Sequence, residues 1–400
     1  MMQKNYITIG KKSQTWYNLD IWKGIIYWFS FLLMIKKFSV KNFKNFKDLI
    51  EIDFSNIRDY SFNTELLKNG LINKAMILGK NNSGKSNLGA AIMDITTHLT
   101  DNKTDNSIYN VYLCGESLEN YAEFTYEFLF NKDVVKYYYR KNSARKLLYE
   151  ELYINNSLVF VYNYTTNEFE NNIVEGNTVD VSKYNNVGVA VLKFIYNNTL
   201  YWSKNNPFKL FMDFVDKMLW FRSLRNNEFI GVMANGEDLN DFIINNKLLK
   251  EFETFLADLG QEYKLCETNG LMGKKIIGVK YKKFVAPFTS VASTGTLTLW
   301  LSFYWLHRST NNISFMYIDE FDAFYNYLVS EKFIELLKKN DYQTIVTSHN
   351  IDLVDNNILR PDCYWFLNGG KIVSFADSYH KTIRKDNNLS KIVRDHGLIF

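Results

Sequence analysis

The 400-residue sequence has little proline, little cysteine and little net charge. Its 3 prolines exclude long proline-rich linkers and indicate a compact chain. The 3 cysteines stand far apart, without the spacing of a metal or redox site, and are typical of reduced cysteines in a cytoplasmic protein: Cys114, Cys266 and Cys363. Lysine and arginine number 47 against 43 aspartates and glutamates, a formal net charge of +4, so the overall charge does not by itself indicate a nucleic-acid-binding protein.

The sequence also lacks an apolar run of membrane-spanning length. Residues 24–35 (GIIYWFSFLLMI) are apolar, but a spanning helix needs about 20 such residues, and no small-residue cleavage site marks a signal peptide. We therefore expect no stable membrane span and a cytoplasmic location. Met34 begins a segment with the pattern of a domain start. We therefore interpret residues 1–33 as an N-terminal extension, which either results from a mis-assigned translation start or is dispensable. An interfacial or packed helix is the alternative.

Hydrophobic periodicity predicts strands and helices in alternation. Residues 37–41 and 50–54 alternate apolar and polar side chains, as half-buried strands do. The segment 122–155 is aromatic, alternating and interrupted by turns, which indicates an antiparallel sheet. Strands resume at 263–288, and the remainder alternates helices with buried strands. These patterns predict an α/β fold with a mixed sheet and an antiparallel β lobe.

Residues 206–262 are predicted to form a helical insertion. Asn206 and Pro207 can cap and begin a helix, and the apolar residues that follow fall at three- and four-residue steps as far as Leu219. A second helical pattern covers 238–259. The insertion separates an N-terminal lobe from a C-terminal lobe, which gives the chain four parts: residues 1–33, 34–205, 206–262 and 263–400.

The strongest motif is GKNNSGKS, which matches the phosphate-loop pattern of glycine, four residues and Gly-Lys-Ser. It follows an apolar strand, 75–78, and precedes a predicted helix, 86–99. The backbone N–H groups of the loop would close around phosphates, Lys85 would reach the β- and γ-phosphates, and the Ser86 hydroxyl would bind Mg²⁺. The predicted nucleotide-binding residues of the loop are Gly79, Lys80, Asn81, Asn82, Ser83, Gly84, Lys85 and Ser86. A chance glycine-rich turn is the alternative, which this context disfavours.

A second motif, FMYIDEFD at 315–322, is predicted to be a buried strand that ends in two acids. Asp319 would orient the Mg²⁺ shell, and Glu320 would act as the general base that polarises the attacking water. Two acids at a strand end are common in proteins without such a role. It is the phosphate loop elsewhere in the chain that favours the functional interpretation.

A third motif, TIVTSHN at 344–350, is a β-rich run that ends in Ser348 and His349. This pattern predicts a histidine at the sheet edge that also carries the phosphate loop. There His349 could contact the γ-phosphate and sense its presence. An ordinary polar residue at a strand end is an equally good interpretation of the motif taken alone.

A fourth motif, ASTGT at 292–296, precedes an apolar helix. Small hydroxyl residues and a glycine, Ser293 and Gly295 among them, can form an anion site at a helix N-terminus. A plain helix cap is the alternative that the motif alone favours. Just upstream of the acidic strand, such a site cannot easily serve the nucleotide of its own chain, but it can serve that of a second copy placed head to tail.

The four motifs in this order resemble those of ABC-type ATPases. The opening IKKFSVKNFKNF and the GxNxSGKS form of the loop are similar to the SMC, RecF and overcoming-lysogenisation-defect (OLD) branch, over roughly residues 34–400. The resemblance implies an ABC-type P-loop ATPase head, with the signature at 293–295, Asp322 as the D-loop acid and His349 as the switch histidine. The signature departs from the family at Thr294, where a small glycine or serine is usual, and no glutamine loop can be placed.

Within this branch, segments such as DEFDAFYN and NNLSKIV are similar to small bacterial ATPases of two-gene phage-defence, or abortive-infection, systems. The resemblance implies an ATPase that requires ATP and Mg²⁺, forms a homodimer or higher oligomer on ATP, and acts with an effector protein encoded nearby. Too few residues follow His349 for the Toprim nuclease domain of OLD proteins, so the effector would act in trans. One alternative is a RecF-like repair clamp on duplex DNA, so a nucleic acid stays a possible ligand. Another is a nucleotide-gated scaffold whose ATP hydrolysis hardly matters.

Overall fold

The computed structural model describes residues 33–102, 104–185, 188–225, 227–232, 238–308 and 313–398. Residues 32–400 form one compact unit, which contains the elements described below. The predicted N-terminal extension, residues 1–33, lies outside the described residues except at Leu33. Within the described ranges, no helix is long and apolar enough to cross a membrane.

An antiparallel sheet of seven strands forms one lobe, in the spatial order β10-β9-β8-β7-β6-β1-β2. Its strands are β1 (Leu33–Lys41), β2 (Ile50–Asp53), β6 (Ala122–Phe130), β7 (Asp133–Ser143), β8 (Lys146–Ile154), β9 (Ser157–Asn163) and β10 (Phe169–Asn171). Every second side chain of β6 is buried, including Phe124, Tyr126 and Phe128, because alternate residues of a strand point to opposite faces. The antiparallel sheet predicted for 122–155 is confirmed.

A second sheet of seven strands is mixed, in the order β12-β11-β16-β17-β5-β18-β19. Its strands are β5 (Lys74–Leu78), β11 (Met218–Arg222), β12 (Glu228–Gly231), β16 (Phe315–Asp319), β17 (Gln343–Ser348), β18 (Tyr364–Asn368) and β19 (Lys371–Ser374). The inner strands are parallel to one another, and both edge strands are antiparallel to their neighbours. All residues of β5, β16 and β17 are buried, as expected of strands covered on both faces. The α/β fold with a mixed sheet that the sequence predicts is confirmed.

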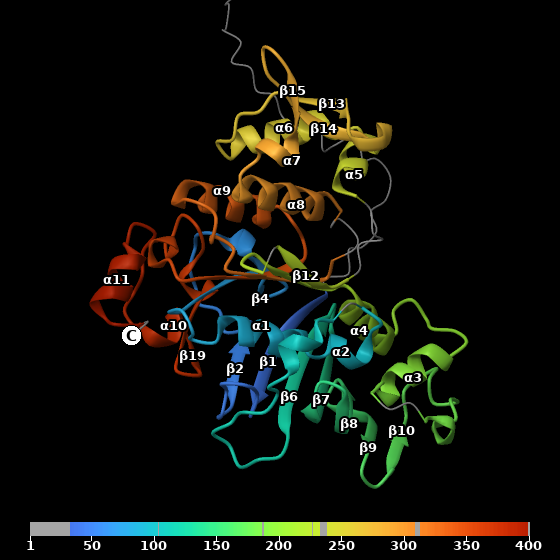
Figure 1. The fold of residues 1–400 in the computed structure, drawn as a ribbon. Helices are drawn as coiled ribbons and strands as arrows, with labels where there is room; N and C mark the ends of the chain where they lie inside the picture. The colour runs from blue at the N-terminus through green and yellow to red at the C-terminus, as the bar shows by residue number, and fades with distance from the viewer. Residues whose placement is uncertain are drawn as a thin grey trace, which may run out of the picture. The chain divides into compact units, whose positions relative to one another are not determined.

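Helix α1 (Lys85–Met93) lies between the two sheets (Figure 1). On one side, the Tyr126 hydroxyl of β6 donates a hydrogen bond to the Ala91 carbonyl at 2.9 Å. On the other side, Gly89 faces the rings of Trp220 and Tyr317, and a Cβ at this position would lie only 2.9 and 2.8 Å from their atoms. The helix that follows the phosphate loop is therefore packed closely on both sides.

Helices α8 (Thr294–Arg308) and α9 (Tyr327–Lys338) cover the other face of the mixed sheet (Figure 1). Phe221 of β11, Trp305 of α8, Ile318 of β16 and Phe333 of α9 line one small apolar cavity between these elements. A three-stranded antiparallel sheet then packs with three helices against α8. These elements are α5 (Leu239–Asn245), α6 (Leu249–Asp258), β13 (Leu265–Asn269), β14 (Lys275–Lys280), β15 (Val285–Pro287) and α7 (Phe288–Val291).

Three further helices, α2 (Thr96–Leu99), α3 (Val191–Asn198) and α4 (Pro207–Asp216), pack against one another beside the antiparallel sheet. The rings of Phe211 and Phe214 on α4 each lie 5.3 Å from the ring of Phe128 on β6. The remaining strands and α-helices are short: β3 (Leu67–Lys68), β4 (Leu71–Ile72), α10 (Phe375–Ser378) and α11 (Leu389–Asp395).

The segment 206–262 differs from the predicted helical insertion. Its first helix, α4, begins as predicted, because Pro207 is its first residue and the Asn206 side chain accepts hydrogen bonds from two N–H groups of its first turn. The helix ends before Met218 and Leu219, which belong to β11 of the mixed sheet, so the prediction of helix at these positions is wrong. An apolar run buried on both faces has no period by which a strand can be told from a helix. The division of the chain into four parts stays a prediction.

Candidate functional site

The carboxyl ends of β5, β17 and β16 lie at one edge of the mixed sheet, because the three strands are parallel neighbours. Strand β5 leads into the loop 79–84 and α1, β16 ends at Asp319 before Glu320, and β17 ends at Ser348 before His349. Ligands of open α/β sheets bind at this edge. The structure therefore brings together three of the four motifs singled out in the sequence.

Two glycines give the loop its shape. Gly84 has a φ of +109°, in the left-handed region, and a Cβ there would lie 2.5 Å from Nδ2 of Asn45. A Cβ at Gly79 would lie 2.5 Å from the carbonyl oxygen of Leu367. Neither position admits a side chain, so the loop approaches its neighbours through its backbone. Between the two glycines, the exposed residues are Lys80, Asn81 and Asn82, and Ser83 is buried.

Lys85 is only 4% exposed, and its ammonium group lies inside the loop. Nζ donates to the carbonyl oxygens of Gly79 at 2.8 Å and of Lys80 at 3.1 Å. It also lies 3.1 Å from Oε1 of Glu320, which neutralises its charge. A cation at the N-terminus of a helix attracts anions, so phosphate oxygens bound here would compete with Glu320 for this ammonium group.

Ser86 and Asp319 meet across the site. The Ser86 hydroxyl donates to Oδ2 of Asp319 at 2.5 Å, and the Thr347 hydroxyl donates to Oδ1 at 2.9 Å. Burial raises the pKa of Asp319, although both hydrogen bonds oppose this effect. A hydroxyl and a carboxylate are the hard oxygen ligands that Mg²⁺ takes, with water and phosphate oxygens filling its shell. The described residues contain no cluster of three or more histidine, cysteine or acidic side chains for another metal.

Glu320 is held in place by the same strand ends. Its φ is +52°, which is strained for a residue with a side chain, and its N–H donates to the Thr347 hydroxyl at 2.8 Å. Its Oε2 lies 3.3 Å from Nδ1 of His349, whose side chain is largely exposed. A carboxylate so placed can accept a proton from a water molecule beside a bound phosphate.

Asp322, the predicted D-loop acid, has a bracing contact. Its Oδ2 accepts a hydrogen bond from the Ser348 hydroxyl at 2.8 Å, which joins the loop after β16 to the end of β17. Burial raises the pKa of Asp322, while the Ser348 hydrogen bond lowers it. This contact fixes the path of the chain directly after Glu320.

The fourth motif has the geometry of a helix cap. The hydroxyl of Ser293 accepts a hydrogen bond from the N–H of Thr296 at 3.2 Å, at the beginning of α8. Gly295 lies close to the chain after Asp322, since a Cβ there would be 3.0 Å from the carbonyl oxygen of Phe324. Within the described part of one chain, no hydrogen bond joins Ser293 or Gly295 to the phosphate loop. Their role in the site of a second copy stays a prediction.

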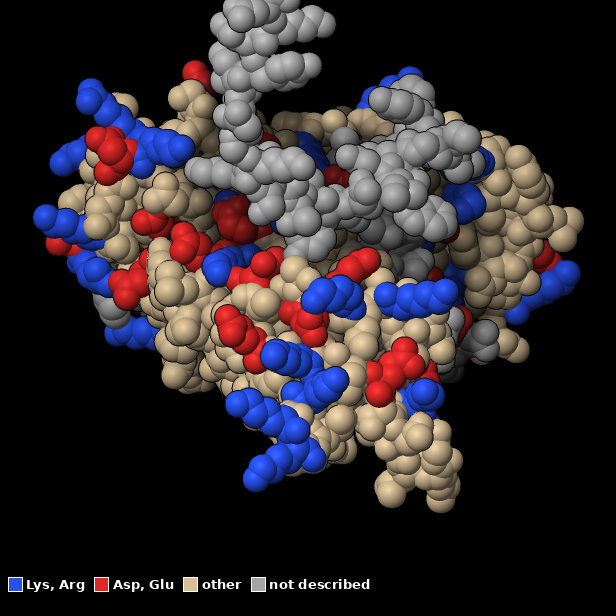
Figure 2. Space-filling model, turned by 90° about the horizontal axis from the view of Figure 1, so that it is seen from above, with Lys and Arg blue, Asp and Glu red and all other residues tan. Residues whose placement is uncertain are grey.

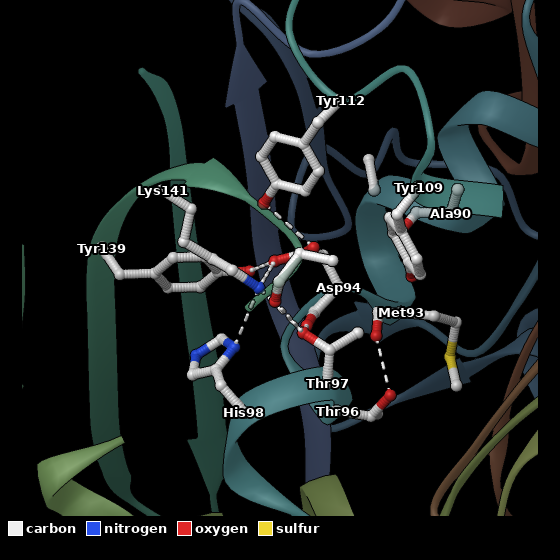
Figure 3. A network of polar contacts seen from close by, with 12 residues as sticks. Ala90, Met93, Asp94, Thr96, Thr97, His98, Tyr109, Tyr112, Tyr139 and Lys141 are labelled. Atoms are coloured by element: carbon white, nitrogen blue, oxygen red, sulfur yellow. Dashed lines mark hydrogen bonds and ion pairs between the residues drawn. The ribbon is translucent and has the colours of Figure 1, made fainter. Parts of the chain in front are cut away.

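Buried charges anchor the C-terminal end of α1 in the antiparallel sheet (Figure 3). Asp94, which follows the last residue of the helix, and Lys141 of β7 form an ion pair of 2.9 Å, and both side chains are 0% exposed. The hydroxyls of Tyr112 and Tyr139 donate to the same carboxylate at 3.0 and 2.9 Å. Burial lowers the pKa of Lys141, and the charge of Asp94 opposes this effect. The helix of the phosphate loop is thus tied to the neighbouring lobe at its far end.

Asn45 and Thr347 belong to the site but escape prediction from the sequence. Asn45, in the connection between β1 and β2, donates to the Ser83 carbonyl at 3.4 Å and accepts from the Asn87 amide at 2.7 Å. It therefore braces the phosphate loop from the antiparallel lobe. Thr347 joins Asp319 and Glu320 through one hydroxyl. Both sets of contacts join segments that are remote in sequence, so no local spacing indicates them.

Arg222 is a third residue beside the site that escapes prediction. As the last residue of β11, it is in register with Asp319, so both side chains leave the same face of the sheet. Its guanidinium group lies 3.0 Å from Glu228 and 3.6 Å from Asp105. The available signal is an arginine at the end of the apolar run MLWFR, which is hidden when that run is interpreted as part of a helix.

Comparisons with known proteins give matches among solved structures alone. No protein-family model matches the chain, and no curated protein matches it. The SMC head domain from Thermotoga maritima is 16% identical, with 85% of this chain and 98% of that chain covered and a TM-score of 0.42. The structure of the recombination mediator protein RecF with ATP is 14% identical, with 86% and 99% covered and a TM-score of 0.38.

A third match is an SMC head domain with an extended coiled coil, bound to the C-terminal domain of ScpA and derived from Pyrococcus furiosus. It is 15% identical, with 86% of this chain and 96% of that chain covered and a TM-score of 0.44. Likenesses of this degree carry no argument about activity. The assignment of a function rests on the geometry of the site.

Proposed function

We propose that this protein is an ATPase that binds ATP with Mg²⁺ at the edge of the mixed sheet. The observation that carries the proposal is the 2.5 Å contact between Ser86 Oγ and Asp319 Oδ2, which joins residues 233 positions apart. It places a hydroxyl and a carboxylate, the ligands that hold Mg²⁺ in phosphate-loop enzymes, at the N-terminus of α1. Lys85 supplies positive charge at the same point.

Each residue of the site has its own role in hydrolysis. Backbone N–H groups of the phosphate loop and the Lys85 ammonium would hold the phosphates, and Ser86 and Asp319 would hold Mg²⁺, which would neutralise phosphate charge. Glu320 exchanges its contact with Lys85 for one with the attacking water and accepts its proton. The histidine beside it, His349, would donate a hydrogen bond to the γ-phosphate.

Direct binding measurements test this site. We expect the full chain to bind ATP in the presence of Mg²⁺ in titration calorimetry, and Lys85→Ala to lose that binding because the buried cation is gone. Lys132→Ala, at an exposed turn of the antiparallel sheet, is the control that keeps it. Retained affinity in Lys85→Ala would show that the loop does not hold the phosphates.

We further propose that two copies combine, as a homodimer or within a higher oligomer, so that Ser293 and Gly295 of one complete the site of the other. The support is their position at the start of the 15-residue helix α8, where N–H groups favour an anion. Ser293→Arg should then keep ATP binding by a single head and lose hydrolysis.

Mixing Ser293→Arg with Lys85→Ala tests the shared site. A mixed dimer has one site with both lesions and one with neither, so some ATPase activity should return. Two heads that hydrolyse independently give no recovery from two defective proteins. Activity that never exceeds that of the separate variants, under conditions of subunit exchange, would leave Ser293 as a helix cap alone.

For the cellular role, we propose a cytoplasmic sensor ATPase of a phage-defence system that acts with a separately encoded effector. The support is the resemblance of motif segments to such ATPases. A RecF-like clamp on duplex DNA is the second candidate, supported by the GxNxSGKS form of the phosphate loop. A small effector gene beside this one favours the first role. ATP-dependent, strongly salt-sensitive binding of duplex DNA favours the second.

A further inference from the structure

The turn between β14 and β15 exposes two aromatic rings. Tyr281 is 43% exposed and Phe284 is 61% exposed, and their ring centroids lie 5.0 Å apart. The N–H of Tyr281 donates to the Phe284 carbonyl at 2.9 Å, which closes the turn and holds both residues at its tip. The two rings therefore form a paired apolar surface in contact with water.

The same turn is strongly basic. Lys280, Lys282 and Lys283 are exposed, and within the described part of the chain their side chains have no hydrogen bond or ion pair. Residues 263–291 contain six lysines and one glutamate, a net charge of +5 against +4 for the whole chain. Figure 2 looks down on the end of Figure 1 that carries β13, β14 and β15, and Lys and Arg side chains lie on this face with Asp and Glu side chains among them. This segment is therefore basic, with a net charge of +5 over 29 residues.

Two of the other lysines in this segment are already neutralised. Lys274 lies 3.3 Å from Asp238 and 3.1 Å from Asp241, and Lys275 lies 3.7 Å from Glu267. A further lysine, Lys264, faces the charge of Glu253, whose pKa it helps to lower. The three lysines of the β14–β15 turn are left to meet an anion from outside. A binding surface at this turn thus combines lysine side chains for anionic groups with flat rings between them.

We propose that the β14–β15 turn, residues 280–285, is a binding site for single-stranded nucleic acid. Lysines neutralise the phosphates of the backbone, and exposed aromatic rings stack on unpaired bases, each stack contributing about 1–3 kcal/mol. In a duplex the bases are stacked on one another, so no base face is available to stack on the two aromatic rings. An acidic protein segment would satisfy the lysines and leave Tyr281 and Phe284 unused.

The path of the chain connects this turn to the proposed nucleotide site. Strand β15 continues into α7, where Phe288 is fully buried, and Ser293 follows at the start of α8. The ring of Phe288 packs edge-on against the rings of Trp300 on α8, 5.4 Å away, and of Phe252 on α6, 5.5 Å away. A nucleic-acid strand bound at the turn would therefore contact a segment that leads, through the buried Phe288, to the element that carries Ser293. This coupling rests on the proposed ATPase function, whereas the binding itself does not.

The experiment measures fluorescence anisotropy of labelled oligo(dT) and oligo(rU) of 20 nucleotides, and of a duplex of equal length, with the full chain and no nucleotide. We expect the single strands to bind more tightly than the duplex. Lys282→Glu with Lys283→Glu should abolish binding at moderate salt, since the lysines face the phosphates. Replacing both lysines by alanine should lower the slope of log K against log salt by about 1.4.

Matched controls separate this turn from general charge and exposure. Tyr281→Ala with Phe284→Ala should weaken single-strand binding at least fivefold per ring, the lower end of what one stacked base contributes, about 1 kcal/mol. Tyr201→Ala with Phe169→Ala removes two other exposed rings and should leave binding unchanged. Lys132→Glu with Lys146→Glu makes the same charge change on the antiparallel sheet and should also leave it nearly unchanged.

Several results would overturn the proposal: no binding of either single strand, equal binding of the duplex, or binding that is indifferent to the ring substitutions. Poly-glutamate that binds at the turn as tightly as oligo(rU) would assign the surface to an acidic protein. The measurement is repeated with Lys85→Ala, which keeps the turn intact. Oligonucleotide binding by a native chain that does not hydrolyse ATP would refute the ATPase proposal and leave this one standing.

Discussion

Replacing Lys141 by methionine removes the cation that neutralises Asp94 and keeps a side chain of similar length. Both groups are 0% exposed, so water cannot take the place of the ammonium group. Leaving one charge of a buried pair without its partner costs about 3–5 kcal/mol of the free energy of unfolding. Two tyrosine hydroxyls still donate to the carboxylate, so we expect a loss near the lower end of that range, about 3 kcal/mol.

A double-mutant cycle with Asp94→Asn separates the ion pair from its packing. The amide has the size of the carboxylate, its oxygen can accept from one tyrosine hydroxyl and its NH2 group can donate to the other, so the doubly substituted protein has no unpaired buried charge at this point. We expect it to be about 2 kcal/mol more stable than the sum of the single changes implies. Urea denaturation followed by tryptophan fluorescence measures these values, with m-values compared between variants.

Lys146→Met is the matched control for this cycle. Lys146 lies at the exposed beginning of β8, in the strand paired with β7, so the same substitution should change the free energy of unfolding by less than about 0.5 kcal/mol. A loss below about 1 kcal/mol for Lys141→Met would contradict the reasoning, because that is the scale of an exposed pair. A double variant whose loss in the free energy of unfolding equals the sum of the two single losses would also contradict the reasoning.

Three other changes have defined outcomes. Burial, and then the charge of Lys141, lowers the pKa of His98 well below 6.5, so the folded chain keeps this imidazole neutral. The free energy of unfolding should therefore fall as the pH decreases below 6.5, where the unfolded chain takes up the proton. His98→Gln should remove this pH dependence, measured by urea denaturation at several pH values. Asn45→Ala removes the hydrogen bonds that support the phosphate loop and should weaken ATP binding about tenfold in calorimetry, roughly the contribution of one or two hydrogen bonds. Unchanged affinity would assign Asn45 a role outside the loop. Translation that starts at Met34 should give a soluble, active ATPase, whereas aggregation or lost turnover would mean that residues 1–33 belong to the fold or to a membrane contact.

The sequence predicts those parts of the site whose role depends on residues that are consecutive in the chain. GKNNSGKS needs its two glycines because Gly84 takes a left-handed backbone and Gly79 lies against a carbonyl. An apolar run before Asp319 implies a strand buried on both faces, and the structure has that strand. Such local rules give the positions of the loop and of the acidic pair without any knowledge of topology.

The parts that the sequence does not predict depend on which strands are neighbours. Strand β17 lies between β5 and β16, and only that order lets Thr347 join the two acids. Arg222 lies beside Asp319 because β11 adds to the sheet, yet its apolar run has no period to distinguish it from a continuation of α4. The contact of Asn45 with the loop is likewise tertiary. Prediction fails where spatial neighbours are remote in sequence.

The central claim is that Glu320, at the end of β16, activates water for hydrolysis of ATP bound at 79–86. The most direct test compares ATP binding and single-turnover hydrolysis of the native protein and Glu320→Gln with Mg²⁺. The amide keeps the shape of the carboxylate and loses its basicity, so we predict that ATP still binds and that hydrolysis slows by about 10²–10⁴-fold. Turnover at the native rate by Glu320→Gln, or no Mg²⁺-dependent ATP binding by either protein, would contradict the account.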